Sequence, residues 1–380
     1  MICKSIEYKN YRNIEAARIE FSPHTTILYG KNAQGKTNML EGVYMFALGK
    51  SHRALRDSEL VRFGCDSAEI TLIYEAGGRT STLTMRIYDG HKRIFEKNGV
   101  RLTKLSDLIG NFRAVLFSPD TLAIVRDGPG ERRAFLDVAI SQLKPVYLGT
   151  LKKYNHILMQ RNALLRHAKA GGGAPAIFEW SEQLAECAAY IAKARSEYTE
   201  RINRHAKEFY RDMTGAKDNS DGGDLMLRYR GTSRIGGDYS DEARLRSIYL
   251  AQFTENIERE IMAGSTQYGP HKDDIEITIN GHEARLYGSQ GQKRSIAVAM
   301  KLAEGEVSRE ESGEYPVFLF DDVLSELDYI RRRYVTSGIK GRQVIVTACD
   351  PATCRRMSQS QDGIYQGYSY YVKGGTAIRK

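Results

Sequence analysis

The chain of 380 residues is too long for one ordinary hydrophobic core, and its 41% hydrophobic residues can fill one large or two linked domains. It has no run of about twenty apolar residues and no apolar signal-peptide core. Its five scattered cysteines form no CxxC pair, so we expect a cytoplasmic protein without a transmembrane helix or zinc site. A net charge of +9 is compatible with a polyanionic partner, but many soluble proteins are mildly basic.

Residues 1–102 are predicted to be mostly β-structure around one helix. SIEY and RIEF have strand character, and residues 26–29 form a short apolar run typical of a buried strand. Further on, residues 68–102 contain β-prone stretches, and Asn98-Gly99 is typical of a hairpin turn, so we expect an antiparallel meander. Between the strand at 26–29 and this meander, apolar residues recur every three or four positions and predict a helix that Gly49 can end. These apolar residues are Met39, Leu40, Val43, Tyr44 and Ala47.

From about residue 130 the pattern predicts two long helical segments. Pro145 interrupts the first segment, and three glycines at 171–173 end it. The second would span roughly 55 Å if it ran unbroken from Ile177 to Met213, at about 1.5 Å per residue. Two such segments joined by a glycine loop suggest an antiparallel helical arm, and the lack of sustained heptads argues against a long coiled coil.

After the arm, the sequence predicts a strand, LMLRYRG, a helix at about 241–262, and then a return to β-structure. DDIEITING and HEARLYG are predicted strands joined at Asn280-Gly281, followed by a helix at about 292–305, the strand PVFLF, another helix and the strand QVIVT. This order predicts an α/β head built from residues 1–115 and 265–380. Residues 116–264 are then inserted as a mostly helical second lobe.

Residues 30–37, GKNAQGKT, have the spacing of a phosphate-binding loop between a strand and a helix. Its glycines let successive backbone N–H groups point at the β-phosphate, Lys36 reaches the β/γ oxygens, and the Thr37 hydroxyl ligates Mg²⁺. The positive N-terminus of the next helix faces the phosphates. The loop predicts nucleotide binding without deciding the function. The predicted nucleotide-binding residues are Gly30, Lys31, Asn32, Ala33, Gln34, Gly35, Lys36 and Thr37.

Two carboxylates, Asp321 and Asp322, follow the apolar strand at 317–320. Beside a phosphate-binding loop, the first is expected to hold Mg²⁺ through water and the second to polarise the attacking water. A strand that merely ends in a polar turn would look similar, but the loop upstream favours the metal-linked interpretation. We therefore predict that Asp321, Asp322 and Lys36 serve catalysis, with Thr37 and Asp321 at the metal.

The stretch LYGSQGQKRSIAVAMKLAE, residues 286–304, resembles the signature motif of ABC-type ATPases. Ser289, Gly291 and Gln292 match the motif, whereas Gln290 stands where a glycine is usual and Gly288 where transporters have leucine. A serine and free N–H groups at a helix N-terminus can cap a γ-phosphate, although such a loop is often an ordinary helix cap. The resemblance implies that these three residues cap, in trans, the nucleotide held by the partner subunit's loop.

SELD at 325–328 resembles the D-loop of the same class, which implies that Ser325 and Asp328 approach the dimer seam. Two elements of the class are missing from the sequence. Transporters carry a histidine just after the last strand, where this chain has Thr347-Ala348-Cys349. No clear Q-loop glutamine follows the strand that ends at Phe117, and residues 118–120 are the candidates for that place.

Nearly the whole chain resembles the RecF family, bacterial recombination-mediator ATPases related to the SMC head domains. The similar stretches include NYRNIE, NAQGKTNMLEGVY, GKSHRALRDSELVRFG, LFSPDTLAIVRDGPGERRAFLD, QRNALL, YGPHKDDIEITING and FDDVLSELD. The resemblance implies an ABC/SMC-type P-loop ATPase head, a mixed sheet with flanking helices and an antiparallel meander, with a helical second lobe. The SHR and GPHKDD stretches belong to the resemblance but have no explanation from the residues alone.

The same resemblance implies an ATP-dependent, head-to-tail homodimer that binds ATP with Mg²⁺ and engages double-stranded and gapped DNA. It implies a role in DNA replication, recombinational repair and the SOS response to DNA damage, together with RecR and RecO, which load RecA. It further implies slow, DNA-stimulated ATP hydrolysis that acts as a switch. The alternatives are the ATPase subunit of a transporter or another SMC-like assembly, and a P-loop kinase or metabolic enzyme. Stimulation of ATP hydrolysis by duplex DNA would favour the first interpretation.

DNA contacts in this family are expected from positive side chains that face the phosphate backbone. Basic residues follow the predicted P-loop helix and recur on the helical arm. For each of them a solvated helix face is the more ordinary explanation. The candidates are Lys50, Arg53, Arg56, Lys152, Lys153, Arg161 and Arg166.

Overall fold

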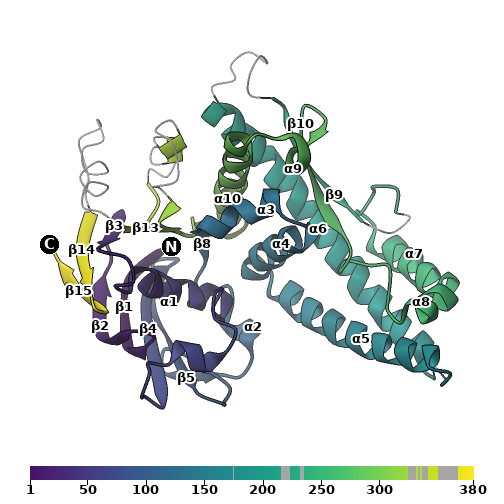
Figure 1. Ribbon diagram of the computed structural model, residues 1–380, viewed down its shortest axis with the longest axis horizontal. Coiled ribbons are helices and arrows are strands. Elements are labelled where there is room, and N and C mark those ends of the chain that lie inside the picture. Colours follow the sequence, from purple (N-terminus) through teal and green to yellow (C-terminus); the bar gives the residue numbers. More distant parts are fainter. Residues whose placement is uncertain are drawn as a thin grey trace. The chain divides into compact units, whose positions relative to one another are not determined.

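The computed structural model describes two compact units of the chain, which are treated separately below (Figure 1). The first unit comprises residues 1–121 and 304–380, and the second comprises residues 122–303. The described residues are 1–173, 175–214, 223–231, 235–323, 331–332, 334–335, 341–349 and 367–380.

The first unit contains a six-stranded sheet with the order β15-β14-β3-β13-β12-β8. All neighbouring strands are parallel except β14 and β15. Strands β12 and β13 are buried along their whole length, which explains why PVFLF and QVIVT read as continuous apolar runs. The bounds are β3 Thr25–Tyr29, β8 Ala114–Phe117, β12 Val317–Asp321, β13 Val344–Ala348, β14 Gly367–Lys373 and β15 Thr376–Arg379.

The second sheet of this unit is antiparallel and has the order β2-β1-β4-β5-β6-β7. The predicted meander at 68–102 is confirmed as its last four strands. Asn98 and Gly99 both have positive φ, 50° and 80°, as a two-residue hairpin turn requires. The bounds are β1 Ile2–Tyr11, β2 Ile14–Glu20, β4 Ser67–Ala76, β5 Arg79–Tyr88, β6 Ile94–Lys97 and β7 Val100–Leu102.

Helix α1 (Lys36–Leu48) packs between the two sheets (Figure 1). It contacts β8, β12 and β13 of the parallel sheet and β4 of the antiparallel sheet. Every residue from 39 to 47 is buried, which explains why apolar residues occur on all sides of this stretch, with Glu41 as the one charged exception. It ends at Gly49, where φ is 68° and the N–H bonds the Met45 carbonyl at 2.7 Å. The predicted helix and its end are confirmed. Short helices among the described residues of this unit include Asp57–Leu60, α2 Leu105–Leu108 and Pro119–Leu122.

The second unit is mostly helical, and the predicted second long helical segment forms one unbroken helix, α6 (Ile177–Thr214). It packs against α5 (Pro145–Lys169) and against α7 (Glu242–Glu255). The predicted helix at 241–262 is in fact two helices, α7 and α8, which meet at Asn256. The other helices are α3 Ala123–Arg126, α4 Pro129–Leu143, α8 Ile257–Ala263, α9 Ala284–Tyr287 and α10 Gln290–Ser312, the last of which continues into the first unit.

A three-stranded sheet, β11-β10-β9, completes the second unit. The prediction of a strand over HEARLYG is wrong beyond its first two residues, because the helix formers that follow make α9. Residues 265–303, which the sequence assigned to the head, belong to this compact unit, because β10 pairs with β9 along its whole length. The functional division into head and lobe stays a prediction. The bounds are β9 Leu225–Arg230, β10 Asp274–Ile279 and β11 His282–Glu283.

The GPHKDD stretch, residues 269–274, is hydrogen-bonded to other elements of the second unit. His271 Nε2 lies 3.1 Å from the Thr266 carbonyl, to which it must donate, so Nδ1 accepts the Tyr154 hydroxyl at 2.6 Å. Burial lowers the pKa of His271 to about 4, so the ring is neutral near pH 7. Gly269 is required because a Cβ there would lie 2.7 Å from the Tyr154 oxygen.

Two further contacts join this stretch to α6 and β9. Arg195 donates to the Pro270 carbonyl at 2.6 Å, and the Tyr229 hydroxyl donates to the buried Asp273 carboxylate at 2.6 Å. The stretch therefore has a structural explanation that the sequence alone did not supply. No helix among the described residues is long and apolar enough to span a membrane.

Candidate nucleotide-binding site

The loop between β3 and α1 has the geometry that its glycines predict. A Cβ at Gly30 would lie 2.3 Å from the Val372 carbonyl oxygen of β14, so only glycine fits against that strand. Gly35 has φ of 108°, in the left-handed region, and a Cβ there would lie 2.9 Å from Asn13 Oδ1. Ala33 also has positive φ, 61°. The chain therefore turns tightly where a backbone N–H cradle is predicted.

Lys36 is the first residue of α1 and is buried. Its Nζ donates to the carbonyl oxygens of Gly30 at 2.7 Å and Lys31 at 2.9 Å. The β14–β15 turn also bonds the loop. Gln34 Oε1 accepts the N–H of residue 374 at 2.8 Å, and the Gln34 carbonyl accepts the N–H of residue 375 at 2.9 Å. The ammonium group and the helix N-terminus thus place positive charge at one point, which suits a phosphate.

Thr37 and Asp321 are brought together by the parallel sheet. The Thr37 hydroxyl donates to Asp321 Oδ1 at 2.9 Å. A hydroxyl and a carboxylate beside a phosphate loop are the hard oxygen donors that Mg²⁺ prefers, so these residues fit that ion. Among the described residues, no group of three or more His, Cys, Asp or Glu is arranged to hold a metal.

The end of β13 supplies contacts that the sequence analysis missed. The Thr347 hydroxyl donates to Asp321 Oδ1 at 2.8 Å and accepts the Asp322 N–H at 3.0 Å. Cys349 Sγ lies 3.0 Å from Asp322 Oδ2 and 2.9 Å from Asn32 Oδ1. From sequence, this segment stood out only for lacking a histidine. A hydroxyl inside an otherwise apolar strand was the signal available.

Glu41 is a second residue that the sequence analysis missed. It is buried on α1 and accepts bonds from Arg12 Nε at 2.8 Å and Nη2 at 2.7 Å, from Tyr11 at 2.9 Å and from Ser51. Burial alone would raise the pKa of Glu41, but the bonds from Arg12 and Ser51 outweigh it and hold the pKa below its usual range. The NYRNIE turn and the SHR stretch are therefore fastened to the P-loop helix through one carboxylate.

Ser51 also explains the SHR stretch locally. Its hydroxyl accepts the N–H groups of Arg53 at 2.9 Å and Ala54 at 2.7 Å, which turns the chain directly after α1. The DNA-contact candidates beside it, Lys50, Arg53 and Arg56, are exposed.

The candidates on α5 differ among themselves. Lys152 and Lys153 are exposed, and Lys153 Nζ lies 3.9 Å from Glu186. The prediction that Arg161 contacts DNA is wrong, because its side chain is fully buried. It pairs with Glu260 at 2.7 Å and stacks 4.9 Å from the Phe253 ring. Arg166 is exposed.

The signature stretch begins α10 with a reciprocal helix cap. The Gln292 N–H donates to Ser289 Oγ at 3.2 Å, and the Ser289 N–H donates to Gln292 Oε1 at 2.8 Å. Ser289 is exposed and Gly291 is half-buried. The predicted seam residues Ser325 and Asp328 lie outside the described residues.

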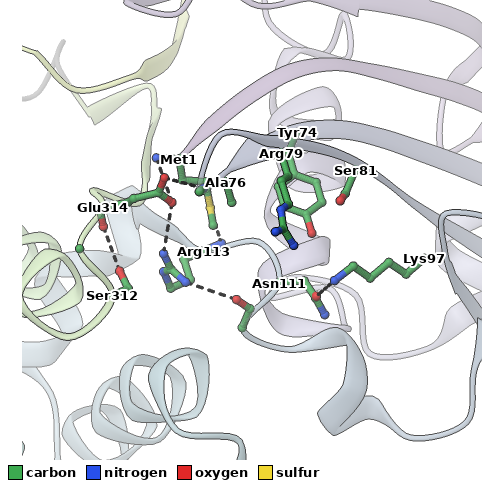
Figure 2. A pocket seen from close by; sticks show the side chains of 13 residues that line it. Met1, Tyr74, Ala76, Arg79, Ser81, Lys97, Asn111, Arg113, Ser312 and Glu314 are labelled. Carbon is green, nitrogen blue, oxygen red and sulfur yellow. Dashed lines mark hydrogen bonds and ion pairs between the residues drawn. The ribbon is translucent and has the colours of Figure 1, made fainter.

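A hollow of about 470 Å³ lies on the first unit but is not this site (Figure 2). Its walls include Tyr74, Arg79, Lys97, Arg113 and Glu314, from β4, β5, β6 and the segments before β8 and β12. None of the predicted site residues lines it.

Comparison with known proteins gives one consistent result. A family model described as RecF/RecN/SMC N terminal domain matches residues 2–369. A DNA replication and repair protein RecF from Ruminiclostridium cellulolyticum is 40% identical over 352 residues, 91% of this chain and 92% of the relative.

Solved structures agree. One, described as the recombination mediator protein RecF-ATPrS in the RecFOR pathway, has a TM-score of 0.89 and 31% identity, and the match covers 100% of this chain and 98% of that one. An SMC head bound to the C-winged helix domain of ScpA has a TM-score of 0.55 at 15% identity, over 100% and 97% of the two chains, which is a likeness of fold alone.

Proposed function

Because this chain belongs to the RecF family of DNA replication and repair proteins, we propose that it is an ATP-switched, DNA-binding dimer of recombinational repair. The observation that carries the proposal is the meeting of Thr37 with Asp321 at 2.9 Å, beside the buried Lys36. That arrangement supports a nucleotide site, and the family supplies the process in which the site is used.

In this proposal the loop residues 30–37 hold ATP, Lys36 neutralises the β/γ oxygens, and Thr37 and Asp321 hold Mg²⁺. The ion would supply charge neutralisation at the phosphates. Asp322 polarises the attacking water. Its side chain is one methylene shorter than the glutamate usual in ABC-type relatives, so we expect slow turnover, suited to a switch.

The shared site requires two copies of the chain. Ser289, Gly291 and Gln292 would cap the γ-phosphate on the partner subunit, with Ser325 and Asp328 at the seam. The exposure of Ser289 and Gln290 at the start of α10 supports this role, because a helix N-terminus at the surface can meet a phosphate. ATP would thus hold the head-to-tail homodimer together.

DNA is proposed to contact exposed basic residues of both units, namely Lys50, Arg53, Arg56, Lys152 and Lys153. The substrates would be double-stranded and gapped DNA. Work with RecR and RecO in loading RecA, in the cytoplasm, belongs to the same proposal. A transporter subunit or other ABC-type ATPase is the competing function, and duplex DNA should not stimulate ATP hydrolysis by such a protein.

The test is the mass in solution with and without ATP and Mg²⁺, for the parent and two variants. Ser289→Arg should bind ATP about as tightly as the parent, because its own loop is intact. It should stay monomeric, because the bulky arginine blocks the nucleotide of the partner subunit. Lys36→Met should lose tight ATP binding, because it lacks the charge at the β/γ oxygens. Lys92→Met, an exposed lysine outside the site, is the control.

Mixing the two variants sharpens the test. A head-to-tail pair would unite the intact loop of Ser289→Arg with the intact signature of Lys36→Met, so partial dimerisation or ATP hydrolysis should return. If Ser289→Arg loses ATP binding as a monomer, the serine serves its own subunit and the shared site is refuted. If Lys36→Met titrates with parental affinity, the loop assignment is refuted.

A further inference from the structure

We propose that Thr347 and Cys349, at the end of β13, are positioning residues that hold Asp321 and Asp322 in the arrangement needed for ATP hydrolysis. The inference rests on the proposed function, in which Asp321 serves the metal and Asp322 the water. It assigns a role to the segment that stands where transporters carry a histidine.

Thr347 is placed to act on both carboxylates at once. Its position is in register with Asp321 on the neighbouring strand. A hydroxyl has one proton to donate and lone pairs to accept, and Thr347 uses both, towards Asp321 Oδ1 at 2.8 Å and from the Asp322 N–H at 3.0 Å. The Thr347 side chain is only 2% exposed, so water cannot easily replace it. One buried hydroxyl therefore orients the metal-linked carboxylate and anchors the backbone of the next residue.

The backbone of Asp322 needs such an anchor. Its φ is 56°, in the left-handed region that residues with a Cβ rarely adopt. Aspartate tolerates this conformation better than most residues, but it still costs free energy, and such conformations cluster at functional sites. The last paired residues of β12 and β13 are Asp321 and Thr347, so the sheet ladder stops just before Asp322. The Thr347 hydroxyl takes the place of a ladder partner for the Asp322 N–H.

Cys349 acts on the side chain of Asp322. Its Sγ lies 3.0 Å from Asp322 Oδ2 and 2.9 Å from the Asn32 amide of the phosphate-binding loop. A thiol has one proton and cannot donate to two oxygens. The oxygen and nitrogen of the Asn32 side-chain amide exchange places when the amide is rotated by 180°. In that orientation the Asn32 NH₂ donates to Cys349 Sγ and the thiol donates to Asp322 Oδ2, so each of the three side chains has a partner. This chain of contacts connects the loop to the proposed base.

Substitutions of Thr347 test the first half of the inference. Thr347→Val keeps the side-chain shape and removes the hydroxyl, and Thr347→Ser keeps the hydroxyl. We expect Thr347→Val to lower kcat at least about tenfold while the ATP affinity from titration stays within about twofold, and Thr347→Ser to recover most of kcat. The free energy of unfolding, measured without nucleotide, shows whether each variant folds.

Thr26→Val is the matched control. Thr26 is fully buried on β3 of the same sheet, and its hydroxyl accepts the Ser22 N–H at 2.9 Å, so the change also removes a buried hydroxyl bonded to a backbone N–H. It should lower stability without lowering kcat. Parental kcat in Thr347→Val, or an equal loss of kcat in Thr26→Val, would overturn the positioning role of Thr347.

Cys349→Ala and Cys349→Ser test the second half. Alanine removes the donor to Asp322, whereas serine keeps one, so we expect Cys349→Ala to lower kcat several-fold and Cys349→Ser to recover part of it, both with ATP affinity near that of the parent. If kcat in Cys349→Ala equals that of the parent, the thiol has no positioning role.

Asp322→Asn separates the failure of this inference from the failure of the proposed function. If Asp322→Asn hydrolyses ATP at the parental rate, the assigned base is wrong, and the proposed hydrolytic site fails with it. If Asp322→Asn binds ATP without turnover while Thr347→Val is as fast as the parent, the proposed function stands and only the positioning role is refuted.

Discussion

His271 shows how one side chain can couple the stability of the second unit to pH. It is held neutral between the Tyr154 hydroxyl and the Thr266 carbonyl, and protonation would abolish the acceptor that Nδ1 offers to Tyr154. Burial is the main cause of its low pKa, and the charges of Lys272, Arg133 and Arg195 lower the pKa further.

We expect His271 to make the protein less stable in mild acid. Its pKa is about 4 when folded against an ordinary 6.5, so the unfolded chain binds the proton first as pH falls. The contribution is complete above pH 6.5 and is lost as pH falls towards 4, by up to roughly 3 kcal/mol. Denaturant unfolding between pH 7 and 4.5 measures it, with His271→Gln as the neutral control. Equal pH slopes for parent and variant would contradict this prediction.

At the scale of single residues, the sequence marks the loop by its spacing but does not mark the residues around it. The residues Lys36, Thr37 and Asp321 follow a fixed spacing imposed by phosphate and metal chemistry, and the structure brings Thr37 and Asp321 together. Glu41 and Thr347 gain their roles from partners that only the folded chain brings near, so no local pattern marks them. No local sequence pattern distinguishes Arg161, which is buried and pairs with Glu260, from an exposed arginine.

At the scale of elements, strongly patterned segments were predicted best. Helix α1, helix α6 and the meander have long or regular apolar patterns, and their types were correct. HEARLYG was wrong because a short segment with few β-formers is decided by its neighbours. The pairing of β10 with β9 places residues 265–303 in the second compact unit, and no sequence pattern reveals it. Their functional assignment to the head stays a prediction.

Gln343, directly before β13, joins the two sheets of the first unit through its side chain. Its amide accepts the Cys3 N–H at 2.6 Å and donates to the carbonyls of Cys3 at 2.7 Å and Ser22 at 2.8 Å. The side chain is buried, and its amide bonds backbone groups in the way that a neighbouring strand would.

We expect Gln343→Leu to destabilise the protein by about 2–4 kcal/mol, because it removes three buried hydrogen bonds to the backbone of Cys3 and Ser22. Denaturant unfolding measures the loss, and hydrogen exchange at Cys3 should become faster. Gln160→Leu changes the same side chain at a half-buried position on α5 and should cost much less. A loss no larger than that of the control would show that the junction contributes little.

At the scale of the whole molecule, the predicted family and fold class are confirmed, since the chain matches RecF proteins and their solved structures along almost its full length. DNA contacts made through phosphates need only positive charge at the surface, so no fixed spacing in the sequence marks the residues that make them.

Salt dependence measures how DNA is held. If exposed basic residues contact phosphates, the logarithm of affinity for duplex DNA should fall linearly with the logarithm of salt concentration, and Arg53→Ala should reduce that slope by about one. Arg259→Ala, an exposed arginine on α8 outside the proposed contacts, should leave the slope unchanged. A flat dependence, or equal binding without ATP, would argue against an ATP-closed basic surface.

The order of strands around β3 has a consequence for how the protein is made. Both neighbours of β3, β13 and β14, come from beyond residue 340, although β3 itself ends at residue 29. During synthesis β3 therefore cannot pair with β13 and β14 until nearly the entire chain has been made. A ribosome-bound or truncated chain carries the complete phosphate-binding sequence without the sheet that shapes it. We therefore expect a chain that ends before β13 to bind ATP weakly or not at all, because β3 then lacks both of its sheet neighbours.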